Sequence, residues 1–251
     1  MDKDPQIANK EKEQSQKPLI KVGLTVGDIN GIGPEVLIKA LKDNRILTDI
    51  IPVVYGSNKV VSFYKKHLNL QDFNYQTCKS ADEVSAKKIN VVNVWQDEIE
   101  IEPGQSNADG GKYALLSLEA ATKDLASGKI DVIVTAPLSK ENVAKAGFDF
   151  VGHTEYLAEM SGAKEALMVL VSGSLRVALV TTHIPIKDIS SKLNKELIVQ
   201  KIEAFEQSLK KDFGIVKPRI AVFGLNPHAG ENGKIGEEEQ HSITPAIQQA
   251  R

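Results

Sequence analysis

The sequence feature that most restricts the fold is a series of short apolar runs that alternate with helical stretches. These runs lie at residues 19–25, 50–56, 88–95, 130–137, 175–183 and 218–226. Strands that are apolar throughout are buried on both faces, which is typical of parallel sheets, and parallel strands need crossovers that are usually helical. The sequence therefore predicts an α/β/α sandwich with a mostly parallel sheet.

Helices are expected between these runs. One is predicted to follow a glycine-rich turn at 27–33, with Pro34 at its first position. An amphipathic helix is predicted over 114–128, after a loop at 103–113, and a longer helix over 194–214. Residues 1–18 are polar and have no apolar stretch of the kind found in signal peptides. We therefore expect a flexible leader at 1–18 and an α/β region over 19–251.

The composition narrows the possible functions. The chain has 251 residues and a net charge of −2, which gives no reason to expect nucleic acid or an anionic membrane as a partner. Its single cysteine, Cys78, excludes an intrachain disulfide framework and fits a reducing compartment. No apolar run approaches the roughly 18 residues needed to cross a bilayer. We expect a soluble, cytoplasmic protein.

Two histidines follow apolar runs at similar positions. His183 ends the stretch "VALVTTH" and His228 lies in "GLNPHAGE". In parallel sheets ligands bind beyond the carboxyl ends of the strands, and imidazole is a common ligand of divalent metals. The alternative is that each histidine only hydrogen-bonds a loop carbonyl. Two histidines at equivalent strand ends favour a metal site.

Four further residues are candidates for contacts with a substrate. His153 and Thr154 begin the helical stretch "HTEYLA", where they could bind an anionic or hydroxylated group or could only cap the helix. Asp28 lies in the loop 27–33, which resembles a phosphate-binding loop but lacks the GxGxxG and Walker A spacings. This loop is alternatively a tight turn that needs glycine at a positive φ. Lys140 could bind a carboxylate or phosphate, or could simply be solvated.

Five blocks together resemble the 4-hydroxythreonine-4-phosphate dehydrogenase family. They are "GDINGIGPEV", "VTAPLSKE", "GHTEYLA", "VTTHIPI" and "GLNPHAGENGKIGEEE", and their order agrees with the family from about Leu19 onward. The first block carries Ile29 and Asn30 where many relatives have Pro-Ala. The resemblance implies a fold like that of isocitrate and isopropylmalate dehydrogenases, with two interleaved subdomains. It also implies a homodimer with active sites at the subunit interface.

The resemblance further implies a reaction. NAD or NADP takes a hydride from 4-phosphohydroxy-L-threonine, and the resulting β-keto acid loses CO2. A divalent metal (Zn, Mg, Co or Mn) is expected, with His183 and His228 as ligands, while His153 and Thr154 correspond to substrate-binding residues. Asp28 and Lys140 are possible supporting residues, and no residue is assigned a catalytic step.

One departure from the family and two alternative functions qualify this expectation. Family members continue beyond the "NPHAGE" block to a "YHDQG"-type block that supplies the third metal histidine, and the sequence has no such block. We therefore expect a chain that is incomplete at the C-terminus relative to the family. A dehydrogenase of threonate or erythronate 4-phosphate, and a truncated subunit without catalytic activity, are the alternative functions.

Overall fold

The computed structural model describes residues 18–163 and 166–251. The predicted leader lies outside the described residues except for Pro18. The chain divides into two compact units, residues Met1–Lys164 and Glu165–Arg251, and each is described by itself. The predicted division into a leader and one region of two interleaved subdomains stays a prediction.

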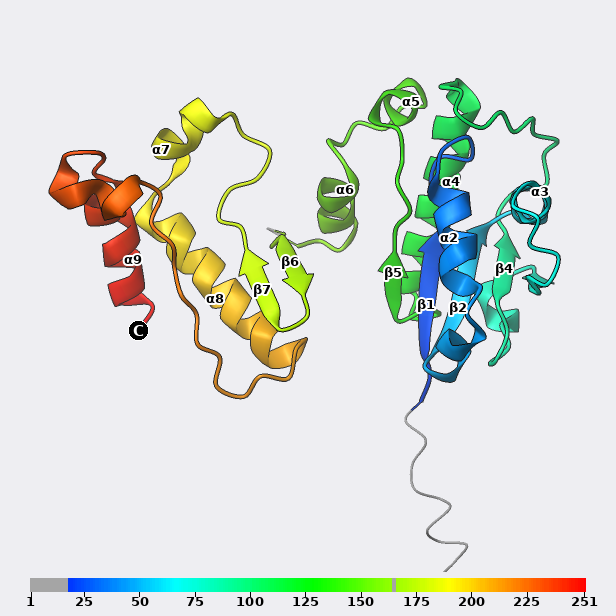
Figure 1. Cartoon of the computed structure of the whole chain (residues 1–251), viewed down its shortest axis with the longest axis horizontal. Helices are drawn as coiled ribbons and strands as arrows, with labels where there is room; N and C mark the ends of the chain where they lie inside the picture. Colours follow the sequence, from blue (N-terminus) through cyan, green and yellow to red (C-terminus); the bar gives the residue numbers. More distant parts are fainter. Residues whose placement is uncertain (1–17, 164–165) are drawn as a thin grey trace, which may run out of the picture. The chain divides into compact units, whose positions relative to one another are not determined.

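The first unit contains a parallel five-stranded sheet (Figure 1). Its strands are β1 (Ile20–Thr25), β2 (Ile50–Gly56), β3 (Gln76–Cys78), β4 (Asn90–Asn93) and β5 (Val132–Val134). The spatial order is β3-β4-β2-β1-β5, and every neighbouring pair is parallel. β3 was not predicted, because it is only three residues long and begins with polar side chains.

Side chains that alternate along β2 divide the first unit into two cores. Val54 faces one core with residues of α2 (Gly33–Leu41) and α3 (Asn58–His67). Val53 and Tyr55 face the other core with residues of α4 (Ala108–Ala126). A strand buried on both faces must be apolar at every position, as β2 is. The predicted α/β fold with a mostly parallel sheet and helices on both sides is confirmed.

Local signals set the starts of these helices. The Ser57 hydroxyl accepts a hydrogen bond from the Val60 N–H at the start of α3, and the Asn107 side chain does the same for Gly110 at the start of α4. The predicted loop at 103–113 therefore ends earlier than expected, because α4 begins at Ala108. Gly110 and Gly111 weaken the helix signal in the sequence, and their tertiary contacts outweigh this local preference.

The second unit is built around one long helix. It contains α7 (Ile189–Lys192), α8 (Lys195–Lys211), α9 (Thr244–Gln249) and the strands β6 (Val169–Ser172) and β7 (Leu175–Ala178). The two strands form an antiparallel hairpin, and Ile198 and Val199 of α8 share a core with Ile243 and Ala246. α8 confirms the helix predicted over 194–214.

Two strand predictions in the second unit were wrong. The run at 175–183 is a strand only as far as Ala178, and it pairs antiparallel within the hairpin. The run at 218–226 forms no strand. Residues 174–180 and 218–223 line one cavity of about 470 Å³ together with α8, and Phe223 is 82% exposed. β-forming residues become a strand only when a neighbour completes the ladder, and here the described residues provide none.

Short turns of helix complete the described chain. They are η1 (Asn44–Thr48), η2 (Ala81–Glu83), η3 (Ile186–Asp188), η4 (Pro227–Gly233) and η5 (Glu239–Ile243), together with α5 (Lys140–Lys145) and α6 (His153–Met160). Within the described residues, every helix is too short or too polar to cross a membrane.

Candidate functional site

The carboxyl ends of β1 and β5 meet at a point where the strand order reverses. β2 pairs with one edge of β1 and β5 pairs with the opposite edge, so the direction in which strands are added changes at β1. This position is the reversal point of the sheet. Ligands of open α/β sheets bind in the crevice at such a point. The Asp28 N–H donates a hydrogen bond to the Pro137 carbonyl (3.1 Å), which joins the loops that follow the two strands.

Gly27 makes this close approach possible. Its φ is +67°, and a Cβ atom at this position would collide with the Pro137 carbonyl oxygen. Residues with a side chain adopt this φ only with strain. The glycine-rich stretch 27–33 is therefore a tight turn that needs glycine, as the alternative interpretation of the sequence proposed.

The Asp28 carboxylate is buried, with 6% of the residue exposed. One oxygen accepts the Asn30 N–H (2.9 Å), and the other accepts the Asn142 side-chain N–H (3.0 Å). The first turn of α4 approaches so closely that a Cβ atom on Gly110 would collide with the carboxylate. The positive end of the 19-residue helix α4 favours a negative charge at this point. Asp28 therefore holds three segments together and is not exposed to a substrate.

Polar side chains extend this cluster along the edge of the sheet. The Asn30 side chain donates to the Asn107 side-chain oxygen (2.9 Å) and accepts the Glu102 N–H (2.8 Å). The Ser106 hydroxyl donates to the side-chain oxygen of Asn142 (2.6 Å). Asn30 and Asn142 are buried, so these hydrogen bonds satisfy polar groups that water cannot reach, and such bonds hold the surrounding loops in place. The sequence analysis did not single out Asn30 as a hydrogen-bonding group, nor Asn142 at all.

Lys140 lies beside this cluster at the start of α5. The hydroxyl of Ser139 accepts the Asn142 N–H (3.3 Å) and caps the helix. The Lys140 side chain is exposed, and the salt bridges found among the described residues do not include it. Its ammonium group is therefore available to an anion at the reversal point.

His153 and Thr154 are the first two residues of α6. The helix is preceded by Gly152, which provides no side-chain cap, so neither residue acts as the helix cap. His153 is half-buried, and this burial lowers the pKa of its imidazole below the ordinary 6.5. The imidazole is therefore neutral at pH 7, where it can both donate and accept a hydrogen bond.

Aromatic packing fixes α6 away from Asp28. Tyr156 packs against Phe148 and Phe150, with ring centroids 5.6 and 5.4 Å apart, and its side chain lies near Thr122 on α4. Asp28 contacts α4 at Gly110, twelve residues earlier, which corresponds to about 18 Å along the helix. The structure does not bring His153 and Asp28 together.

His183 and His228 both belong to the second unit. Both are exposed and have positive φ angles, 56° and 53°. The expectation that each follows a strand of the parallel sheet was wrong, because β7 ends at Ala178 in a hairpin and the run at 218–226, directly before His228, forms no strand. His228 instead begins five consecutive left-handed residues, 228–232, inside η4.

A buried glutamate holds the turn that carries His228. The Glu239 carboxylate accepts the backbone N–H groups of Leu225 and Asn226 (both 2.7 Å) and the side-chain N–H of Asn226 (2.9 Å). The bond from the Asn226 side chain is the largest cause that lowers the pKa of Glu239. Left-handed residues other than glycine cost about 1–2 kcal/mol each, so the turn needs such support.

The described residues do not complete a metal site. No group of three or more His, Cys, Asp or Glu side chains among them could hold a metal ion. Two imidazoles are one protein ligand short of the three that catalytic zinc sites use.

Comparisons with known proteins place these features in a family. A family model described as pyridoxal phosphate biosynthetic protein PdxA matches residues 48–251. The chain is 45% identical over 231 residues, 92% of its length, to 4-hydroxythreonine-4-phosphate dehydrogenase of Bacteroides thetaiotaomicron. It is 35% identical over 232 residues, 91% of its length, to a Bradyrhizobium diazoefficiens protein provisionally named D-threonate 4-phosphate dehydrogenase.

A solved structure is also similar. A crystal structure of a 4-hydroxythreonine-4-phosphate dehydrogenase from Burkholderia phymatum superimposes with a TM-score of 0.78 at 36% identity and covers 93% of this chain. The chain spans 63% of the length of the Bacteroides protein, 66% of the Bradyrhizobium protein and 71% of the Burkholderia chain.

Proposed function

This chain belongs to the PdxA family of pyridoxal phosphate biosynthetic proteins, and from that membership we propose that it is a 4-hydroxythreonine-4-phosphate dehydrogenase of vitamin B6 biosynthesis. In this reaction the carbon that carries the hydroxyl group of 4-phosphohydroxy-L-threonine gives a hydride to NAD or NADP. The hydroxyl proton is released, and the resulting β-keto acid loses CO2 to give 3-amino-2-oxopropyl phosphate. The observation that carries the proposal is the family match over residues 48–251, which includes every candidate site residue except Asp28.

The first unit supports binding of an anionic substrate at two places. Lys140 offers a positive charge at the reversal point of the sheet. His153 and Thr154 offer a neutral imidazole and a hydroxyl at the start of α6, where backbone N–H groups have no side-chain cap. We assign His153 and Thr154 to binding of the substrate, and Asp28 to holding the loop beside Lys140.

The cofactor, metal and assembly are part of the proposal. A nicotinamide cofactor, NAD or NADP, follows from the proposed dehydrogenase activity. We keep His183 and His228 as proposed ligands of a divalent metal, and a complete site requires at least one ligand beyond those found in the described residues. A homodimer with active sites at its interface, and a cytoplasmic location, are proposed on the same family basis.

The alternative substrate is a sugar-acid phosphate. It is favoured by the 35% identity to the protein provisionally named D-threonate 4-phosphate dehydrogenase. The two substrates share the phosphate and carboxylate and differ in carrying an amino or a hydroxyl group. The same scaffold could therefore serve either substrate. The third alternative is that the chain is a subunit without catalytic activity.

The experiment compares NAD and NADP reduction with 4-phosphohydroxy-L-threonine, D-threonate 4-phosphate and D-erythronate 4-phosphate, with each divalent metal added in turn. We expect kcat/KM to be highest for 4-phosphohydroxy-L-threonine. A preference for a sugar-acid phosphate would favour the alternative substrate, and no reduction with any substrate would favour the subunit without activity. The variant His153→Ala should lose substrate binding, whereas His67→Ala, on α3, provides the matched control.

A further inference from the structure

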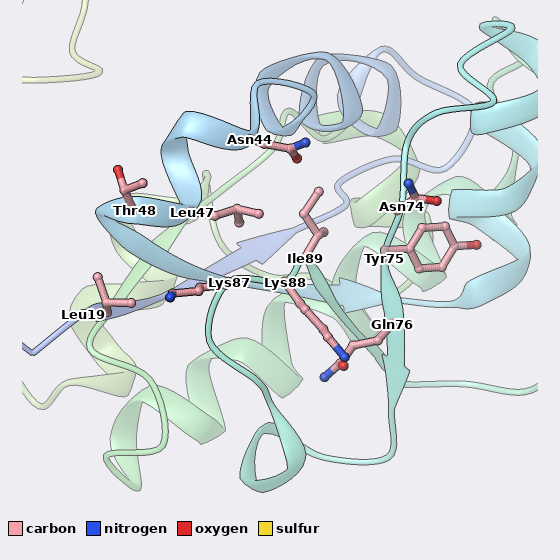
Figure 2. A pocket seen from close by; sticks show the side chains of 10 residues that line it. All are labelled: Leu19, Asn44, Leu47, Thr48, Asn74, Tyr75, Gln76, Lys87, Lys88 and Ile89. Atoms are coloured by element: carbon pink, nitrogen blue, oxygen red, sulfur yellow. The ribbon is translucent and has the colours of Figure 1, made fainter.

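A cavity of the first unit lies at the edge of the sheet where the strands begin (Figure 2). Its volume is about 950 Å³, which is within the range of small-molecule sites. Leu19 and Gln76 line it and lie at the starts of β1 and β3, and Ile89 directly precedes β4. β1 has six residues, so this edge is about 20 Å from the loop that carries Asp28. The cavity is therefore separate from the reversal point of the sheet.

The middle of the cavity is apolar. Ile89 is 2% exposed, and Leu19 and Leu47 are half-buried. Figure 2 shows the side chains of Leu47 and Ile89 projecting into the middle of the cavity. The exposed apolar surface therefore belongs to Leu19 and Leu47, above the buried Ile89, and covering it with a carbon group of a ligand is favourable.

The charge of the lining is positive. Lys87 and Lys88 line the cavity, and none of its lining residues is acidic, although the chain carries a net charge of −2. The salt bridges found within residues 18–163 and 166–251 include neither lysine. Asp43, directly before η1, is already paired with Arg45. Among the described residues, neither ammonium group has a carboxylate partner at this cavity.

The backbone holds one of these lysines in an unusual conformation. Lys87 has a φ of +59°, a region that residues other than glycine adopt with strain. In Figure 2 its side chain extends toward Leu19, whereas that of Lys88 extends toward Gln76, so the two ammonium groups lie at different parts of the lining. A strained lysine next to a second lysine is consistent with a site for a negatively charged group.

The remaining polar groups also favour an anion. The amide N–H groups of Gln76 already donate to Asn90 (2.7 Å) and Ser85 (3.1 Å), and that of Asn74 donates to the Asp72 carbonyl (3.1 Å). The side-chain donors left for a ligand include the two ammonium groups, the amide of Asn44 and the second amide N–H of Asn74. A cationic ligand would find no carboxylate among the residues that line the cavity.

We propose that this cavity binds a small organic anion, whose phosphate or carboxylate group contacts Lys87 or Lys88 and whose apolar body covers the half-buried Leu47. The proposal does not depend on the proposed enzyme activity, because it concerns binding at a different edge of the sheet.

Isothermal titration calorimetry of the 251-residue chain tests this proposal with phenyl phosphate, benzoate, benzyl alcohol and inorganic phosphate. We expect at least one of the two aromatic anions to bind more tightly than benzyl alcohol and inorganic phosphate, and the comparison of the two anions identifies the preferred acid group. The double variant Lys87→Gln/Lys88→Gln should weaken that binding by about tenfold or more, because hydrogen bonds from charged donors to an anion are stronger than those from neutral donors. The control Lys66→Gln/Lys123→Gln removes the same charge outside the cavity and should leave binding unchanged.

A second variant tests the apolar part of the site. Leu47→Gln should weaken binding of the aromatic anion and leave that of inorganic phosphate unchanged. Circular dichroism verifies that each variant is folded. The proposal is overturned if neither aromatic anion binds, if the cavity variants bind like the unmodified chain, or if both lysine double variants lose affinity equally. The last result would show that the anions bind through general charge attraction.

Discussion

At the scale of residues, two buried carboxylates hold loops through amide groups. Asp28 binds the N–H of Asn30 and the side chain of Asn142, and Glu239 binds Leu225 and Asn226. A buried carboxylate that accepts several N–H bonds has its oxygens satisfied and holds the donor segments in place. Each of these residues therefore fixes a loop that carries or adjoins a candidate site residue, Lys140 in one unit and His228 in the other.

Replacing Glu239 with glutamine should destabilise the second unit by about 1–3 kcal/mol, because an amide cannot accept all three N–H bonds. The pKa of Glu239 is lowered in the folded state, so its contribution is complete above the unfolded value of 4.5 and is lost as the pH falls below it. Thermal unfolding between pH 7 and pH 3 measures both effects. The exposed Glu203→Gln variant is the control, and equal pH dependence in all three chains would contradict the assignment.

His153 should titrate below 6.5 in the folded chain, because burial disfavours its charged form. Because the pKa of His153 is lower in the folded than in the unfolded chain, protonation of its imidazole opposes folding. The free energy of unfolding therefore decreases as the pH falls from 6.5 through the folded pKa. An NMR titration of the imidazole protons measures the midpoint, and the His153→Gln variant identifies the resonance. A midpoint at or above 6.5 would show that the imidazole is not buried as described.

At the scale of elements, the contact between α4 and α5 depends on glycine. A Cβ atom on Gly111 would collide with the carbonyl oxygen of Asn142, the residue whose side chain binds Asp28. Gly111→Ala would stabilise an isolated helix, yet we expect it to destabilise this chain by about 1–3 kcal/mol because the two helices must move apart. Chemical denaturation measures the change, with Asp109→Ala in the same turn as the control. An increase in stability would contradict the close contact.

The strand predictions succeeded where a neighbouring strand completes the hydrogen-bond ladder. The run at 50–56 became β2 because β1 and β4 lie on either side, whereas the run at 218–226, which is apolar over 220–223, has no such partner within the described residues. Hydrogen exchange should therefore be slow for the amides of Val53 and Val54 and fast for those of residues 220–223. Comparable protection of both segments would show that the second segment is paired in solution.

The candidate site was only partly predictable for a related reason. Asp28 and Lys140 could be placed at strand ends from local pattern alone, because strands and turns have short-range signals. The bond from Asn142 to Asp28 joins residues 114 positions apart, and no periodicity in the sequence indicates such a pair. The left-handed turn at 228–232 was also unforeseen, because four of its five residues are not glycine.

At the scale of the whole molecule, the family match spans both units, from residue 48 to residue 251. The first unit provides a sheet with its reversal point at β1 and β5, and the second provides His183 and His228 on turns. The chain spans 63% of the length of the Bacteroides relative, and the described residues contain two of the at least three protein ligands that the proposed metal site requires.

The central claim is tested most directly by the stoichiometry of the reaction. The chain is incubated with carboxyl-labelled 4-phosphohydroxy-L-threonine, NAD or NADP and a divalent metal, and the reduced nicotinamide and labelled CO2 are measured together. Oxidation followed by decarboxylation predicts equal amounts of the two products and the appearance of 3-amino-2-oxopropyl phosphate. Absence of both products, or CO2 released without reduction of the nicotinamide, would contradict the proposed dehydrogenase activity.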